Sequence, residues 1–317
     1  MKELYSLFGV VSVVTTPFDE RDRIDLESLA RTVDDRLAAG VEGIVLPAVA
    51  SEVGKLSPVE RRTLVRAVVE RAAGRVPVIA GASAPDLPES IAMAEFAAEL
   101  GCTGVLVQAP PTILHDRAAL QRHFGAIAQT GAPMLMIQDL EWDGPGMPVD
   151  VVTQLFEEIP AFRCLKVEVV PTGPKYTAVL RATGGKLNVS GGWASMQLIE
   201  ALDRGVHAFM PSAHHWVYVE ILRRYQAGRR SEAQALFDRL LPILAFGTQH
   251  IDVSIQFQKL LAVRQGIFRT ANVRSPSVVF DEYHRHIADE LLERAMALHY
   301  DVGWRPLAGI GSPSCDQ

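Results

Sequence analysis

Short β-branched runs alternate with longer helical patterns eight times along the first two thirds of the chain. The runs are "GVVSVVTTPF", "EGIVLPA", "VPVIAGAS", "TGVLVQAP", "APMLMIQDL", "FRCLKVE", "KLNVSGG" and "VHAFMPSA". Most are followed by apolar residues at helical spacing. Eight such units predict an α/β fold of the (β/α)8 TIM barrel type. An open doubly wound sheet is the alternative, but no glycine-rich phosphate loop follows the first run.

The alternation stops after Gly228. Three helical patterns follow without strands between them: "SEAQALFDRLLPILAFG", "DVSIQFQKLLAVRQG" and "SVVFDEYHRHIADELLERAMALH". We therefore expect a barrel in residues 1–228 and a C-terminal helical appendage of three helices in residues 229–300. The tail, residues 301–317, is expected to be disordered.

Composition excludes several classes of partner. The net charge is −6 with both signs interspersed, and no basic stripe is present, so we expect no nucleic acid partner. No apolar stretch has the length of a membrane span. The N-terminal segment has no small-residue cleavage site and is interpreted as leading into a first strand. Three cysteines without CxxC spacing argue against disulfides and a zinc site, which favours a cytoplasmic location.

One lysine interrupts the apolar sixth run, "FRCLKVE". Strand alternation puts Cys164, Lys166 and Glu168 on one face, and residues near the C-terminal end of a barrel strand face the active-site mouth. A lysine amine in a partly desolvated pocket is a nucleophile that forms a Schiff base with a ketone. The alternative is a structural lysine paired with an internal carboxylate, such as that of Glu168.

At this point the chain resembles the dihydrodipicolinate synthase and N-acetylneuraminate lyase superfamily of Schiff-base aldolases and dehydratases. The resemblance covers nearly the whole chain and is carried by "VVTTPFDERDRIDLESL", "AAGVEGIVLPAVASEVGKLSPVER", "RVPVIAGAS", "FRCLKVE" and "NVSGGWASMQLIEALDRGVHAFMPS". It implies that Lys166 is the Schiff-base lysine and that the substrate is pyruvate or another 2-keto acid. It also implies that no metal or other cofactor is needed and that the protein is a homo-oligomer, a dimer or tetramer.

The chain departs from the family pattern at several places. The family's glycine-threonine-threonine-glycine-glutamate loop, which binds the keto acid's carboxylate, corresponds here to residues 48–52, with Ala50, Ser51 and Glu52 as the candidate contacts. The proton-relay tyrosine of the fifth strand is absent, because the matching pair is Ile137-Gln138. The synthases' substrate-binding arginine falls near Trp142. These losses argue against lysine-biosynthetic synthase activity.

Other side chains complete the candidate site. Glu168 is the first candidate to replace the missing proton shuttle, Asp139 is a weaker one, and Gln138 orients a hydroxyl. Trp142 and Trp193 either line an apolar pocket or pack in the core, and Lys175 is expected at the rim. Further substrate-binding candidates, at the ends of the seventh and eighth strands, are Ser190, Gly191, Met210 and His214. Ser190–Gly192 is interpreted as a simple turn rather than an anion site.

The sequence thus predicts a lyase, an aldolase or dehydratase, that acts through a Schiff base on a 2-keto acid. A 2-keto-3-deoxy sugar acid or another pyruvate aldol is the expected substrate. One alternative is a barrel that binds a keto or sugar acid without turnover. The other is a metal-dependent aldolase that uses His207, His214 or His215 with Glu168, although the histidine spacing is poor for a metal site.

Overall fold

The chain forms a closed barrel of eight parallel strands, as predicted. The computed structural model describes residues 2–307, and the strands pair in chain order from β1 to β8, which pairs back with β1. The strands are β1 (Gly9–Val13), β2 (Gly43–Leu46), β3 (Val78–Gly81), β4 (Gly104–Gln108), β5 (Leu135–Leu140), β6 (Phe162–Glu168), β7 (Asn188–Gly191) and β8 (Ala208–Phe209). This topology is that of a TIM barrel.

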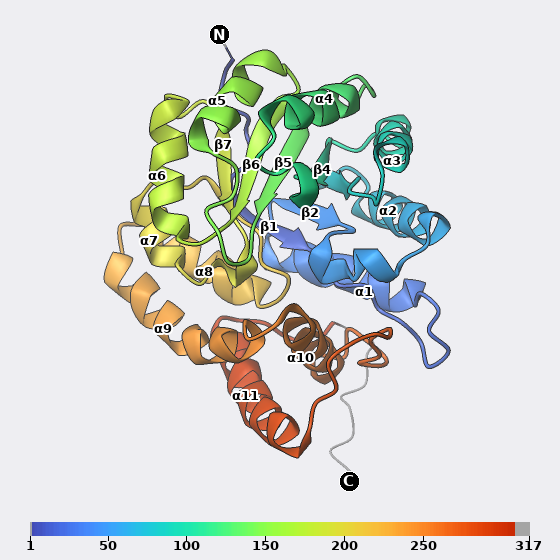
Figure 1. Cartoon of the computed structure of the whole chain (residues 1–317). Coiled ribbons are helices and arrows are strands. Elements are labelled where there is room, and N and C mark those ends of the chain that lie inside the picture. Colours follow the sequence, from blue (N-terminus) through green and yellow to red (C-terminus); the bar gives the residue numbers. More distant parts are fainter. Residues whose placement is uncertain (1, 308–317) are drawn as a thin grey trace.

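A helix follows each strand and covers the outside of the barrel (Figure 1). These helices are α1 (Leu26–Ala39), α2 (Pro58–Ala72), α3 (Leu87–Glu99), α4 (Arg117–Ala128), α5 (Val149–Glu158), α6 (Thr172–Ala182), α7 (Leu198–Asp203) and α8 (His215–Gln226). The start of α2 shows how local sequence sets a boundary. Ser57 and Glu60 form a reciprocal capping box, and Pro58 occupies the first helical position.

Alternation along the strands divides the buried apolar residues into two cores. Val13, Val45, Ile79, Met136 and Cys164 belong to one cluster that fills the barrel interior. Their strand neighbours belong to a larger cluster between the sheet and the helices. Because successive strand side chains point to opposite faces, membership of the inner cluster identifies which positions face the lumen.

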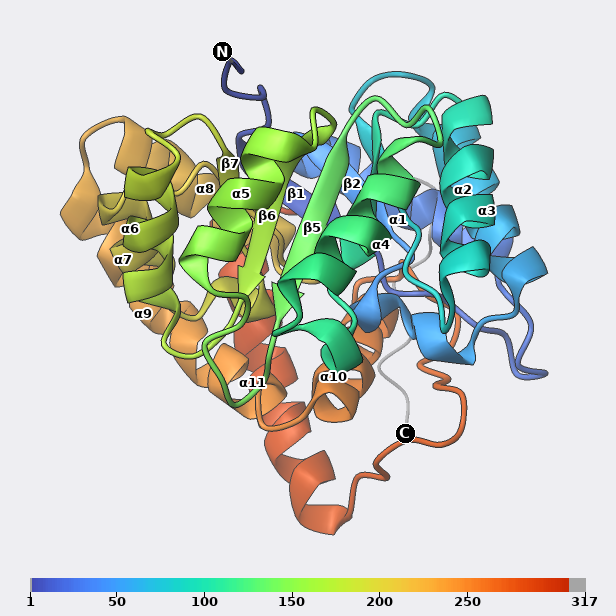
Figure 2. The same cartoon turned by 45° about the horizontal axis from the view of Figure 1, so that its top comes forward.

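The appendage consists of α9 (Arg230–Gly247), α10 (Ile251–Arg264) and α11 (Glu282–Asp301), which lie together on one side of the barrel (Figures 1 and 2). Helix α11 begins later than the pattern from Ser277 suggested. Asp281 caps the helix by accepting the N–H of His284, and the preceding N–H of Val278 bonds to Asp252 instead. The N–H of Val278 is therefore satisfied outside a helix.

The expected disorder does not hold for residues 301–307. Asp301 is the last residue of α11, and Trp304 is buried with its indole N–H donated to Asp35 at 3.0 Å. Burial of this indole holds the segment after α11 against the barrel helices. The rest of the predicted tail, residues 308–317, lies outside the described residues.

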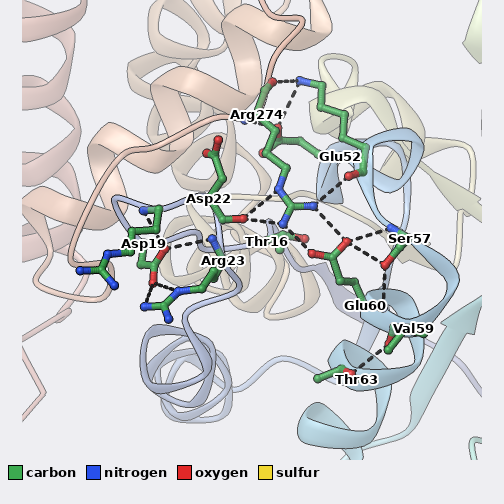
Figure 3. Close-up of polar contacts among 12 residues, drawn as sticks. Thr16, Asp19, Asp22, Arg23, Glu52, Ser57, Val59, Glu60, Thr63 and Arg274 are labelled. Carbon is green, nitrogen blue, oxygen red and sulfur yellow. Dashed lines mark hydrogen bonds and ion pairs between the residues drawn. The ribbon is translucent and has the colours of Figure 1, made fainter.

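A buried ionic cluster fastens the appendage to the barrel. The Lys259 ammonium of α10, fully buried, pairs with Glu52 and bonds to the carbonyl of Asn272 at 2.7 Å. Arg274 donates its backbone N–H to Glu52, and its guanidinium pairs with Glu60 and bonds to the carbonyl of Asp22 (Figure 3). Burial lowers the pKa of Lys259 to about 8, against the opposing effect of Glu52. Two chain segments more than 200 residues apart thus share one set of charges.

Of the helices described, none has both the length and the apolar character needed to cross a membrane.

Candidate active site

Lys166 lies inside the mouth of the barrel. It sits near the C-terminal end of β6, in register with Gln138 of β5 and Ser190 of β7. Its side chain is 5% exposed, and its Nζ lies 3.1 Å from Oε2 of Glu168. The ammonium therefore faces the lumen within an ion pair, and the structural and chemical interpretations of this lysine are both compatible with its position.

A cavity opens directly in front of this ion pair. Its empty volume is about 440 Å³, counted with the solvent at its opening. The lining residues are Val13, Ala48, Val49, Ala50, Trp142, Lys166, Glu168, Trp193, Met210, Ser212, Ile251 and Ser254. A mainly apolar wall with a few converging polar groups is the usual form of a small-molecule site.

Glu168 is the most heavily engaged polar group in the cavity. Its Oε2 contacts Lys166 and accepts a hydrogen bond from the amide of Gln138, and its Oε1 accepts the backbone N–H of Trp193 at 2.7 Å. Gly192 leaves room for this carboxylate, since a Cβ there would lie 2.1 Å from Oε1. The "SGG" turn and the residue after it thus accommodate the carboxylate of Glu168, an anion of the protein itself.

On β5, Gln138 and not Ile137 faces Lys166. Ile137 belongs to the outer core, between the sheet and the helices, and strand alternation then turns Gln138 inward, where it reaches Glu168. Of the pair Ile137-Gln138, which the resemblance matched to the family's tyrosine and asparagine, only Gln138 is directed toward Lys166. The inward position carries an amide, which orients neighbours but does not transfer protons at neutral pH.

The loop after β5 rests on a buried ion pair. Lys175 lies 3.0 Å from Asp139 and donates to the carbonyls of Pro145 and Met147. Asp139 in turn accepts the N–H of Met147 at 2.8 Å. The expectation that Lys175 lies at the rim is therefore wrong, because its ammonium is buried among loop carbonyls. It positions the loop that carries Trp142.

The second-strand loop contributes mainly through its backbone. Residues 49–51 form a short 3-10 turn, and Ala50 lines the cavity. The hydroxyl of Ser51 donates to the carbonyl of Val14 and accepts the N–H of Ala48, so it serves the loop itself. Glu52 points to Lys259 of the appendage. Among the three candidates on this loop, only Ala50 borders the cavity.

The candidates on β7 and beyond β8 are separated by the structure. Met210 lines the cavity, and Ser190, fully buried, contacts it with Oγ 3.8 Å from Sδ. Gly191 faces the helical layer, where a Cβ would lie 2.7 Å from the hydroxyl of Tyr176. A side chain at position 191 would therefore point away from the lysine cavity, so the geometry does not support the prediction that Gly191 contacts the substrate.

His214 does not border the lysine cavity. Its Nδ1 lies 3.1 Å from Nε2 of His299, and it lines a second cavity, with an empty volume of about 330 Å³, between β8 and the appendage. That cavity shares Ser212 and Ser254 with the first. The backbone of His214 is left-handed at the start of α8, and the His214 ring points to His299 and away from the mouth of the barrel. The prediction of His214 as a substrate contact is therefore not supported by the geometry.

The histidines of the metal-dependent alternative are also dispersed. His207 accepts the N–H of Val189, and His215 contacts the carbonyl of Pro211. Within residues 2–307 there is no group of three or more His, Cys, Asp or Glu side chains arranged to hold a metal ion.

The buried histidines predict acid sensitivity of the fold. Burial and Arg36 lower the pKa of His299 to about 3, and burial holds the pKa of His214 and His215 well below 6.5. Below pH 6.5 the unfolded chain binds protons that the folded chain does not, so the free energy of unfolding falls as the pH falls. Between pH 7 and 5 we expect a loss of about 2 kcal/mol per histidine, measured by urea unfolding.

The variant His299→Gln should reduce the loss of unfolding free energy between pH 7 and 5 by the contribution of one histidine. The matched control is His286→Gln, since His286 is largely exposed on α11 and should leave the difference between pH 7 and 5 nearly unchanged. Equal stability of the wild-type protein at the two pH values would contradict the interpretation.

Sequence reasoning missed several residues of the cavity wall. Val13 ends β1, and Ser212 follows β8, so both had a strand-end signal that was not used. Ile251 and Ser254 come from the first turn of α10, far from the barrel in sequence. No local pattern marks a helical residue that becomes part of a cavity only after docking.

A buried lysine and carboxylate at the mouth of a (β/α)8 barrel are the groups that a class I, Schiff-base aldolase would use. Known proteins agree with this class. The profile of the "Dihydrodipicolinate synthetase family" matches residues 6–295, and the chain belongs to that family. It is an enzyme of the class I aldolase type.

Individual relatives span nearly the whole chain. A 4-hydroxy-tetrahydrodipicolinate synthase of Xanthomonas campestris is 28% identical over 299 residues, 92% of this chain and 96% of that protein. The dihydrodipicolinate synthase of Rhodopseudomonas palustris has a similar fold, with a TM-score of 0.84, 24% identity and coverage of 93% and 99% of the two chains. A prophage protein of E. coli K12 from the same family, solved in complex with pyruvate, gives a TM-score of 0.82, 21% identity and coverage of 92% and 99%.

Proposed function

We propose that this protein is a lyase that cleaves or dehydrates a pyruvate aldol, a substituted 2-keto acid, through a Schiff base on Lys166. The observation that supports this most directly is the Lys166 amine beside Glu168 at the inner end of a cavity. A lysine kept only for structure would not need open space in front of its amine.

The ion pair supplies the first proton transfer. A proton passes from the Lys166 ammonium to Glu168, only 3.1 Å away, which leaves a neutral amine and a carboxylic acid. The amine attacks the ketone carbon, and the acid then protonates the departing hydroxyl, which leaves as water. Glu168 performs here the proton transfers for which no phenol is available on β5. The amide of Gln138 keeps the carboxylate oriented toward Lys166.

The keto acid's carboxylate is assigned to the second-strand loop. The turn at residues 49–51 starts at the cavity wall, and the first N–H groups of a helical turn have no partner within it. The N–H groups of Val49 and Ala50 are thus available to bind a carboxylate, and no hydroxyl is needed. In this proposal the substrate's ketone lies between the loop and β6.

Aldol cleavage and dehydration share the imine, and either fits this site. The substrate expected from the sequence is a 2-keto-3-deoxy sugar acid or another pyruvate aldol. That the protein forms a homo-oligomer, a dimer or tetramer, stays a prediction. Its location in the cytoplasm also stays a prediction.

The direct test is reductive trapping of the imine. Incubation with pyruvate and borohydride should give a reduced pyruvyl adduct, and peptide mass spectrometry should place it on Lys166. The variant Lys166→Met should take no adduct under the same conditions. The matched control is Lys55→Met, a partly buried lysine outside the cavity, which should keep the adduct.

Two results would contradict the proposal. One is the absence of an adduct with pyruvate and with other short 2-keto acids. The other is an adduct that persists in Lys166→Met. Tight binding of a keto acid without any adduct or turnover would support the non-catalytic alternative.

A further inference from the structure

Two indoles form the outer wall of the lysine cavity. Trp142 follows β5 and Trp193 follows β7, and their rings meet edge to face with centroids 4.5 Å apart and an interplanar angle of 72°. Both line the cavity that contains Lys166. Both also line an adjoining cavity, whose empty volume is about 740 Å³ when the solvent at its opening is included. The two tryptophans therefore lie where the lysine cavity meets the adjoining cavity.

Core packing does not account for these two rings. Trp142 is 44% exposed, and neither tryptophan is part of the apolar clusters that fill the barrel and its helical layer. A large apolar side chain costs free energy when it stays exposed to water. An exposed aromatic surface beside a cavity is typical of a ligand-binding wall.

Dedicated contacts hold the loop that carries Trp142. Glu141 accepts the N–H of Gly146 at 2.7 Å, and the carbonyl of Gly144 accepts the N–H of Val170 at 2.8 Å. The Lys175 ammonium donates hydrogen bonds to two further carbonyls of this loop, those of Pro145 and Met147. The loop is thus fixed at both ends, and the exposed indole is fixed with it.

Trp193 is held by the catalytic carboxylate. Its backbone N–H bonds to Glu168, and its φ is +50°, in the region where side chains other than glycine are strained. The strained backbone directs the indole toward Trp142. The same carboxylate that contacts Lys166 therefore also sets the position of this aromatic wall.

The lysine cavity itself has few polar side chains for a polyhydroxylated chain, and of the two cavities only the adjoining one is lined by Thr172, Gln197 and Thr248. Apart from Lys166 and Glu168, the polar side chains that line the lysine cavity are the hydroxyls of Ser212 and Ser254. Each hydroxyl of a bound sugar acid would need a partner, because an unpaired buried hydroxyl weakens binding. Indole faces instead favour a planar apolar group.

We propose that the part of the substrate beyond the reacting bond is a planar apolar group, such as an aryl ring, that packs against Trp142 and Trp193. This inference rests on the proposed Schiff-base function. The substrate class is then an aryl-substituted pyruvate aldol, which yields pyruvate and an aromatic aldehyde.

The reaction balances with the groups present. In 4-hydroxy-2-oxo-4-phenylbutanoate, bound as the Lys166 imine, the C3–C4 bond breaks and its electron pair forms an enamine. The C4 hydroxyl proton goes to Glu168, and benzaldehyde leaves. Glu168 then returns this proton to C3 of the enamine, which restores the imine, and hydrolysis of the imine takes up the water released earlier and frees pyruvate and the Lys166 amine.

The test compares two aldols of the same keto acid. We expect kcat/KM for the phenyl aldol to exceed that for a 2-keto-3-deoxy sugar acid by about tenfold or more. Trp142→Ala and Trp193→Ala should each lower this ratio by about tenfold, and Trp142→Phe should lower it less. Tyr283→Ala, which removes an exposed aromatic ring that does not line the cavity, should leave the ratio unchanged.

Imine trapping separates the two levels of the proposal. If pyruvate is trapped on Lys166 but the sugar acid is the better substrate, or the ratio is the same in Trp142→Ala, the aromatic assignment is wrong and the Schiff-base function stands. If pyruvate is not trapped, both fail together. Because Trp142 is largely exposed, its variants should fold, and circular dichroism checks this.

Discussion

Glu168→Gln is expected to lower kcat/KM for the preferred aldol by about 10²–10⁴-fold, the usual contribution of a general acid–base group. Glutamine has nearly the same shape, and its carbonyl oxygen is able to accept the N–H of Trp193 as Oε1 does now. The amide has no basic oxygen to take the Lys166 proton. The rate of imine trapping should fall along with turnover, because the same proton transfer frees the amine.

A second variant distinguishes a chemical role of Glu168 from a structural one. In the double variant Gln138→Glu with Glu168→Gln, a carboxylate again lies in the register position beside Lys166, this time from β5. Part of the lost activity should return. If Glu168 only anchors Trp193, Glu168→Gln alone will keep wild-type activity, and that result would remove Glu168 from the mechanism.

Glu52→Leu is expected to lower the free energy of unfolding by about 3–5 kcal/mol, the cost of leaving a buried charge unpaired. Lys259 is fully buried, and without Glu52 its ammonium still contacts the carbonyl of Asn272 and the ring of Phe18, 4.4 Å from its Nζ, neither of which carries a charge. Lys259→Met should cost less, because Glu52 still has Lys55 at 3.2 Å and the N–H of Arg274. Denaturant unfolding measures both.

The double variant Glu52→Leu with Lys259→Met should recover much of the loss, since two apolar side chains replace the buried pair. Glu70→Leu is the control, because Glu70 is exposed on α2 and its replacement should change stability little. Additive losses in the double variant would show that the two charges do not depend on each other.

The sequence predicted those features that depend on neighbouring residues. Period-two alternation in "FRCLKVE" placed Lys166 and Glu168 on one face, and Ser57 with Glu60 marked the start of α2. Gln138, a candidate contact from the sequence, is the residue of β5 that faces Lys166, because a shift of one residue turns a side chain to the opposite face of a strand.

Features set by tertiary contacts were beyond sequence reasoning. Lys175 appeared to be a rim lysine because its partner Asp139 is far from it in sequence. His214 appeared to reach the mouth because its partner His299 belongs to α11. The pairing of Glu52 with Lys259, likewise, joins a barrel loop to the appendage. In each case the polar side chain contacts a residue that is distant in sequence and that only the tertiary structure brings near it.

The first turn of α10 supplies Ile251 and Ser254 to the wall of the lysine cavity. The proposed Schiff-base lysine and part of the wall of its cavity therefore belong to different regions of the chain. Over evolutionary time, substitutions in the appended helices can change which compound is accepted while the lysine and its carboxylate are inherited intact. Such a division allows descendants of one barrel to acquire new substrates without rebuilding its interior.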